Sequence, residues 1–141
     1  MKTRLIMIPL MLFSTMVMAQ KEEVKKIKTT IEGFVKAGDE NNHEEIGNYL
    51  DANYRVVMNR LFGSEAVGVV NKDEYIAKIE SKEWGGDKRE ITYEEIIITG
   101  TVATAKVKLV GSKMTFISNF TLIQNAEGDW MLLSDTPVIE A

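Results

Sequence analysis

The clearest candidates for acid–base chemistry lie in a strand-like stretch near the middle of the chain. Tyr93, Glu94 and Glu95 belong to KREITYEEIIIT, which is rich in β-branched residues. Strict alternation puts Glu95 on the same face as Tyr93. If that face lines an apolar interior, burial disfavours the carboxylate, and Glu95 could act as a general acid or base. If the face points outward, Glu95 is a surface or dimer-contact residue, which is the interpretation that the sequence favours.

Three further side chains could take part in such chemistry. Asp51 and Asp135 each end an expected element and could lie near the mouth of a cavity, although residues at such ends are more often caps and turn formers. Tyr54, like Tyr93, could donate a hydrogen bond to a substrate. These residues are weak catalytic candidates, with Glu95 or Asp51 as the base, and none of them specifies a reaction.

Metal chemistry has little support in the sequence. His43 is the single histidine and the chain has no cysteine, which leaves almost no material for a zinc site. The acidic run 39–45 lacks the central glycine of a calcium-binding loop. We therefore expect a capping or exposed role for His43, a solvated acidic face, and neither a metal nor a cofactor.

A sheet must position these residues, because four consecutive strands are expected between Lys88 and Asp135. The segments KREITYEEIIIT, TVATAKVKLVG, KMTFISNFTLIQN and DWMLLSD are rich in Ile, Val, Thr, Phe or Trp, and turn residues separate them. In the last strand Trp130, Leu132 and Ser134 should share a face, and Pro137 should end the sheet.

Upstream, the apolar stripe Val24, Ile27, Ile31, Phe34 and Val35 predicts a helix at 21–37. Helices are also expected at about 43–50, with Asn42 as cap and Glu45 three residues on, and after the cap Asn71, with Glu74 three residues on. Short strands are expected at 54–61 and 66–70.

The order of these elements, α-α-β-β-α-β-β-β-β, indicates an α+β domain. We expect a curved antiparallel or mixed sheet that wraps around the N-terminal helices as a cone, since strands twist. The open end of the cone should hold an apolar hollow that is poor in titratable groups. Its expected lining residues, which could instead simply fill the core, are Phe34, Met58, Ala105, Phe116, Ser118, Phe120, Trp130 and Leu132.

The first nineteen residues have the layout of a secretory signal peptide. Lys2 and Arg4 make the start of the chain basic, residues 5–18 are uncharged and mostly apolar, and Ala19 offers a small residue at the cleavage position. The apolar run is shorter than the ~20 residues of a membrane span. We therefore expect an exported protein, periplasmic or secreted, with residues 20–141 as a single domain and no membrane association after cleavage.

The charge of the remaining chain excludes one class of partner. Loss of Lys2 and Arg4 leaves 15 of the 17 basic residues, against 21 acidic residues. Nucleic-acid binding requires a basic surface that neutralises phosphates, so we expect no nucleic-acid partner.

Over residues 22–136 the chain resembles a known family. The matching features are IEGFVKAGDENN, YRVVMNRLFGSEAVGVVN, NKDEYIAKI, ATAKVKL and FTLIQNAEGDW. Their order is similar to the cystatin-like, nuclear transport factor 2-like fold, and more closely to its small exported members named putative lumazine-binding proteins.

The resemblance implies a cone-shaped domain that often pairs through its open sheet face. Related enzymes include ketosteroid isomerase, polyketide cyclases and scytalone dehydratase, whose acids, bases or donors project into the cone. Family members often carry an acid where this chain has Ser118, and related members carry histidines where it has Ser134 and Thr136. These departures imply fewer ionisable groups in the cavity.

Three functional interpretations remain open. The first is an exported domain without evident catalytic residues that binds a small apolar or planar molecule and pairs as a homodimer. The second is an isomerase, cyclase or dehydratase that acts on a small hydrophobic substrate in the cone. The third is an interaction module that uses the open sheet face.

Overall fold

The computed structural model describes residues 7–140, so residues 1–6 of the predicted signal peptide lie outside the described residues. The helices are α1 (Met7–Asp39), α2 (His43–Ile46) with the following 3-10 turn η1 (Gly47–Tyr49), and α3 (Lys72–Glu80). The strands are β1 (Leu50–Asn59), β2 (Val67–Asn71), β3 (Glu90–Thr99), β4 (Val102–Val110), β5 (Thr115–Gln124) and β6 (Trp130–Ile139). None of the helices within 7–140 is both long and apolar enough to cross a membrane.

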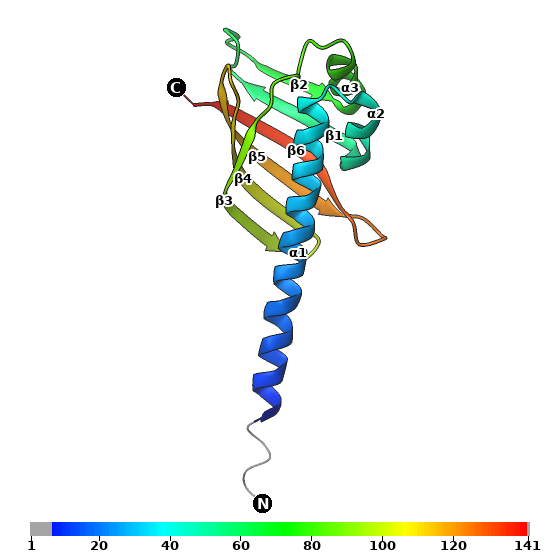
Figure 1. Cartoon of the computed structure of the whole chain (residues 1–141), viewed down its shortest axis with the longest axis vertical. Coiled ribbons are helices and arrows are strands. Elements are labelled where there is room, and N and C mark those ends of the chain that lie inside the picture. Colours follow the sequence, from blue (N-terminus) through cyan, green and yellow to red (C-terminus); the bar gives the residue numbers. More distant parts are fainter. Residues whose placement is uncertain (1–6, 141) are drawn as a thin grey trace, which may run out of the picture.

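The strands form one six-stranded mixed sheet in the order β2-β1-β6-β5-β4-β3. Strand β1 runs parallel to β6, and all the other neighbouring pairs are antiparallel. Helix α1 crosses one face of the curved sheet, and α2 and α3 lie near its last turns, with α3 packed on β1 and β2 (Figure 1). The predicted α+β class and element order are confirmed.

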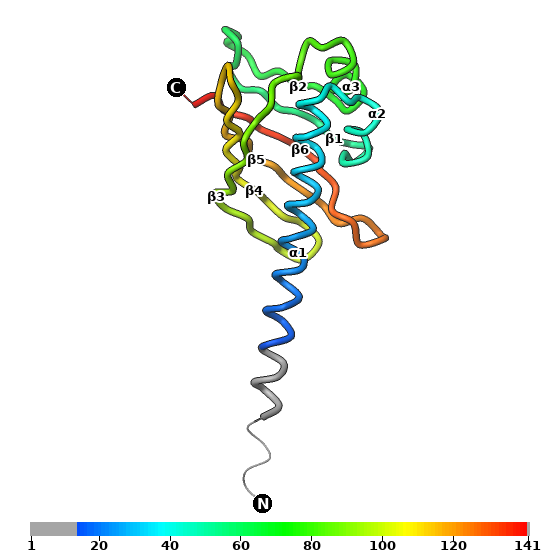
Figure 2. Tube along the Cα trace, viewed as in Figure 1, coloured from blue at the N-terminus to red at the C-terminus, as the bar shows by residue number. Residues whose placement is uncertain are grey.

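Helix α1 is held to the sheet by an apolar stripe. Ile27, Ile31, Phe34 and Val35 recur at helical spacing, and each is at most 2% exposed. The helix begins at Met7 rather than at the predicted Lys21, because the apolar N-terminal run is also a good helix former. The dark-blue turns of α1 that follow residue 13 extend beyond the sheet (Figure 2).

Both asparagine caps form as the sequence predicts. The Asn42 side chain accepts a hydrogen bond from the Glu45 backbone N–H at the start of α2. Asn71 and Glu74 make a reciprocal capping box at the start of α3. These caps help to set the directions of the two short helices that close one end of the cone.

A bulge in β3 overturns the expected alternation around Glu95. Tyr93 pairs with Val107 and Glu95 with Lys106, so Glu94 is an extra residue between two successive pairs. The bulge separates Tyr93, which packs against the core, from Glu95, which is exposed on the outer face. The prediction that these two side chains share a face is therefore wrong.

A second bulge, at Leu133 in β6, turns a polar side chain toward the core rather than away from it. Leu132 pairs with Leu122 and Ser134 with Thr121, so Leu133 is the extra residue. The shift turns Asp135 onto the inner face, where Leu132 also lies. The prediction that Ser134 shares a face with Leu132 is therefore wrong.

Pro137 does not end the sheet, because β6 continues to Ile139 and Pro137 pairs with Ser118. Strand β1 pairs with β6 only as far as Asp135, so one side of β6 is an open edge beyond that residue. A proline is tolerated on such an edge. Asp135 consequently lies within a strand rather than at its end.

Candidate functional site

A cavity of about 600 Å³ opens on the concave side of the sheet. This volume lies within the range of small-molecule sites. Its walls come from the sheet, from α3, from the end of α1, from the loops 60–66 and 111–114, and from segment 81–89, which joins α3 to β3. The wall is mostly apolar, with contributions from Val56, Met58, Leu61, Phe62, Ile79, Trp84, Leu109, Met114, Phe116 and Pro137.

A carboxyl and a hydroxyl meet inside this wall. Asp135 on β6 and Ser118 on neighbouring β5 both line the cavity and are both buried, at 8% and 2% exposed. Ser118 Oγ donates a hydrogen bond of 3.1 Å to Asp135 Oδ2. Burial raises the pKa of Asp135 to about 7, against lowering effects from the Ser118 hydrogen bond, the Arg89 charge and the Asn119 backbone. The group can therefore gain or lose a proton near neutral pH.

Two tyrosines lie close to this carboxyl. Tyr54 on β1 and Tyr75 on α3 pack edge to face at 5.5 Å between ring centroids, and Tyr75 also lines the cavity. Burial raises the pKa of both phenols, and the Asp135 charge adds to the effect, so both stay protonated at neutral pH. Tyr54 Oη and Asp135 Oδ1 are buried polar side-chain atoms without a hydrogen-bond partner among the described residues.

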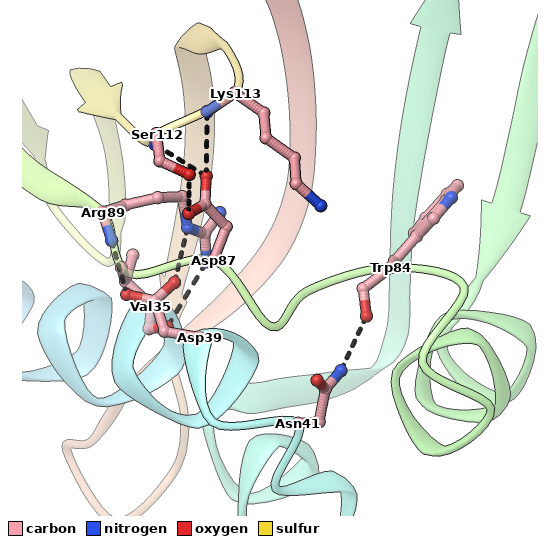
Figure 3. Close-up of polar contacts among 8 residues, drawn as sticks. All are labelled: Val35, Asp39, Asn41, Trp84, Asp87, Arg89, Ser112 and Lys113. Atoms are coloured by element: carbon pink, nitrogen blue, oxygen red, sulfur yellow. Dashed lines mark hydrogen bonds and ion pairs between the residues drawn. The ribbon is translucent and has the colours of Figure 1, made fainter.

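An ion pair holds segment 81–89 and the start of β3 to the end of α1. Arg89 Nε lies 2.6 Å from Asp39 Oδ1, and the Arg89 backbone N–H donates to Asp39 Oδ2 at 2.9 Å (Figure 3). Arg89 also donates to the Val35 carbonyl at 3.3 Å. Because Arg89 lines the cavity, this pair fixes one side of its mouth.

Further contacts hold the rest of the mouth. Asp87 accepts hydrogen bonds from the Ser112 hydroxyl at 2.6 Å and the Ser112 backbone at 2.8 Å (Figure 3). Asn41 Nδ2 donates to the Trp84 carbonyl at 2.8 Å. Gly85 has φ of +81°, and a Cβ there would lie 2.3 Å from the backbone oxygen of Gly38. The tight packing requires glycine at this position.

The prediction of a hollow that is poor in titratable groups is therefore wrong. Its wall is largely apolar, but Asp135, Ser118 and Tyr75 line it. The bulge at Leu133 is the reason, because it turns Asp135 inward. Sequence reasoning treated Asp135 as the end of a strand and did not single out Tyr75, Trp84 or Arg89 as site residues. The only local signal was the run of four apolar residues at 130–133, which breaks the alternation.

The predicted lining residues separate into two groups. Met58, Phe116 and Ser118 lie in the cavity wall. The others lie in the packed core: Phe34, Ala105, Phe120, Trp130 and Leu132. Of these, Trp130 also donates from Nε1 to Glu23 at 2.7 Å and so ties β6 to α1.

The catalytic candidates of the sequence do not meet in the cavity. Glu95 borders a shallow polar depression on the outer face of the sheet. Tyr93 donates to the Lys28 carbonyl and to Glu32 and thereby anchors β3 to α1. Asp51 accepts from the backbone N–H of Asn53 at 2.8 Å, which is a turn-forming contact. Tyr54 is the one candidate that lies beside Asp135.

The single histidine and most of the acidic run 39–45 are surface features. Asp39 is the exception to the expected solvated face, because its side chain is only 11% exposed and pairs with Arg89. His43 Nε2 lies 3.8 Å from Glu80, and both side chains are substantially exposed. No group of three or more His, Asp or Glu side chains able to hold a metal occurs within residues 7–140.

The fold and its cavity define a class of protein: a cone-shaped nuclear transport factor 2-like domain. The family model described as "Putative lumazine-binding" matches residues 22–136, and the chain belongs to that family. No curated protein matches the sequence.

Solved structures show the same fold. A nuclear transport factor 2-like protein of unknown function from Silicibacter pomeroyi is 17% identical, with a TM-score of 0.74 over 86% of this chain and 98% of that one. Another nuclear transport factor 2-like protein of unknown function, from Shewanella baltica, is 14% identical, with a TM-score of 0.73 over 85% of this chain and 95% of that one. A DUF4783 family protein from Bacteroides ovatus is 12% identical, with a TM-score of 0.56 over 77% of this chain and 94% of that one.

Proposed function

We propose that the protein binds a small, largely apolar molecule inside the cone. The observation that carries this proposal is the cavity of about 600 Å³ with a mainly apolar wall and a buried carboxyl at one place in it. Apolar walls supply most of the binding free energy of such sites, and a few polar groups orient the ligand. The membership of the putative lumazine-binding family supports the same coarse class of function.

Native mass spectrometry of protein purified from its host tests the proposal directly. We expect a retained small molecule, and we expect naphthalene to bind the emptied protein and to change the fluorescence of Trp84, which lines the cavity. Met58→Trp should block binding because Met58 lines the wall. Val57→Trp is the matched control on the opposite face of β1. No retained molecule and no naphthalene binding would refute the proposal.

A second candidate function is proton-transfer catalysis, and the cavity carboxyl is the specific observation that favours it. A carboxyl with a pKa of about 7 can act as a general acid or base at neutral pH. In this role Asp135 replaces Glu95 and Asp51, and the Tyr75 hydroxyl is the hydrogen-bond donor. Exchange of the α-protons of 2-tetralone with deuterium from D₂O should be faster with the protein and lost in Asp135→Asn. Equal rates in both proteins would exclude this role.

We also propose that the protein pairs as a homodimer through the outer face of the sheet. Apolar side chains on this face are exposed, with Val67 at 60%, Val69 at 58% and Val138 at 52%. Light scattering should give twice the chain mass for the protein and a single chain mass for Val69→Glu. A monomeric unmutated protein would contradict the pairing.

We also propose that the protein is exported, with cleavage of its N-terminal segment before Gln20. The N-terminal turns of α1 extend beyond the sheet (Figure 1), and residues 14–19 are exposed, with Met16 at 75% and Met18 at 68%, so these residues contribute nothing to the core. N-terminal sequencing of protein from the host should begin at Gln20. A start at Met1 would contradict export by cleavage.

A further inference from the structure

The buried carboxyl lacks part of the hydrogen bonding that its surroundings require. Ser118 donates to Asp135 Oδ2, whereas Asp135 Oδ1 has no partner among the described residues. A buried carboxylate oxygen without a donor costs free energy, and proteins rarely leave such an atom unsatisfied. The group borders the cavity, so a molecule in the cavity can reach the carboxyl and supply the missing donor.

Most of the charges at the cavity mouth are already compensated. Asp39 neutralises Arg89 at 2.6 Å, and Lys78 neutralises Glu83 at 2.8 Å. Asp87 accepts hydrogen bonds from Ser112, and the nearby Lys113 helps to hold the pKa of Asp87 below its usual range. Lys113 also lines the mouth (Figure 3) and has no ion-pair partner among the described residues, but it is exposed, and solvent weakens the attraction of an exposed charge for an anionic ligand.

We propose that the ligand of the cone is a largely apolar molecule without a negative charge that places a single hydrogen-bond donor, an O–H or an N–H, against Asp135. This inference rests on the proposed binding function and names the chemical class of its ligand. An anionic ligand would lose its hydration in the largely apolar wall and would also be repelled by the Asp135 carboxylate. A ligand with only an acceptor would face the lone pairs of the carboxylate.

The donor preference should depend on pH in a defined direction. Tyr54 from β1, Tyr75 from α3, Ser118 from β5 and Arg89 from the start of β3 surround Asp135. The raised pKa values keep both phenols protonated at neutral pH, so Asp135 is the group that titrates. Its pKa is raised to about 7, so it accepts hydrogen bonds at pH 8 and carries its own proton at pH 5.5.

Four probes with the same ring system test the inference in the unmutated protein. Naphthalene, 2-naphthol, 2-methoxynaphthalene and 2-naphthoate carry no polar group, a donor, an acceptor and a charge, respectively. At pH 8 we expect 2-naphthol to bind about tenfold more tightly than naphthalene, as a hydrogen bond to a charged group implies. The other two probes should gain nothing, and the tenfold preference should shrink at pH 5.5.

The variants Asp135→Asn and Asp129→Asn complete the test, because Asp129 is an exposed aspartate in the turn before β6. The 2-naphthol preference should disappear in the first variant and persist in the second. If Asp135→Asn does not fold, the pH comparison in the unmutated protein decides the question.

Equal binding of naphthalene and 2-naphthol would overturn the inference and leave the proposed binding function standing. Tightest binding of 2-naphthoate would also overturn it. No binding of any probe would remove the binding function and the inference together.

Discussion

Replacing Asp135 by Asn should stabilise the protein at alkaline pH, although the residue is buried. The pKa of Asp135 is raised from 3.8 to about 7, mainly by burial, so the native state favours the protonated carboxyl. Between these two pH values the native state binds more protons than the unfolded chain, so the free energy of unfolding falls as pH rises. Asparagine is never charged and escapes this loss.

The magnitude follows from the two pKa values. The raised pKa destabilises the native state by about 4 kcal/mol at pH 8 and by about 1.5 kcal/mol at pH 5, at roughly 1.4 kcal/mol per pH unit. The asparagine can still accept from Ser118, but its NH₂ group lacks a partner, and that cost is the same at both pH values. The effect of the substitution should therefore become more stabilising by about 2.5 kcal/mol from pH 5 to pH 8.

Urea unfolding of the unmutated protein and of Asp135→Asn, each at pH 5 and pH 8, measures how the effect of the substitution changes with pH, provided that the m-values agree. We call this change the double difference. Asp129→Asn serves as the control, because an exposed carboxyl should change the difference by less than about 0.5 kcal/mol. A double difference below about 1 kcal/mol, or one of opposite sign, would refute the assignment of Asp135 as a buried, destabilised carboxyl.

The remaining predictions concern the mouth of the cavity and the helix that borders it. Asp39→Asn should lower the free energy of unfolding by about 2 kcal/mol, because it leaves the partly buried charge of Arg89 without a partner. Adding Arg89→Met removes that charge and should restore part of the lost stability. Urea unfolding measures both effects. Gly85→Ala should cost about 2 kcal/mol or more, whereas Gly63→Ala, with a similar φ of +79° and open space around it, should cost about 1 kcal/mol; equal losses would contradict the close contact at Gly85. Asn71→Ala should cost about 1 kcal/mol in the same assay through loss of the capping box, and Asn71→Ser should cost less.

The sequence by itself predicted those features that depend on neighbouring residues along the chain. The stripe of Ile27, Ile31 and Phe34 predicted a helix that packs on a sheet, and both are observed. The Asn71–Glu74 spacing predicted the start of α3, because a cap and its partner lie within one turn of each other. Four strand-like segments near the C-terminus predicted most of the curved sheet.

The tertiary structure alone decided which polar residues enter the cavity. Alternation along a strand assigns faces only while pairing continues without an extra residue, and each bulge reverses the assignment for all that follows. One extra residue, Glu94, placed Glu95 outside, and another, Leu133, placed Asp135 inside. The register of β3 against β4 and of β6 against β5 sets these bulges, so the site depends on pairings between segments that are distant in the sequence.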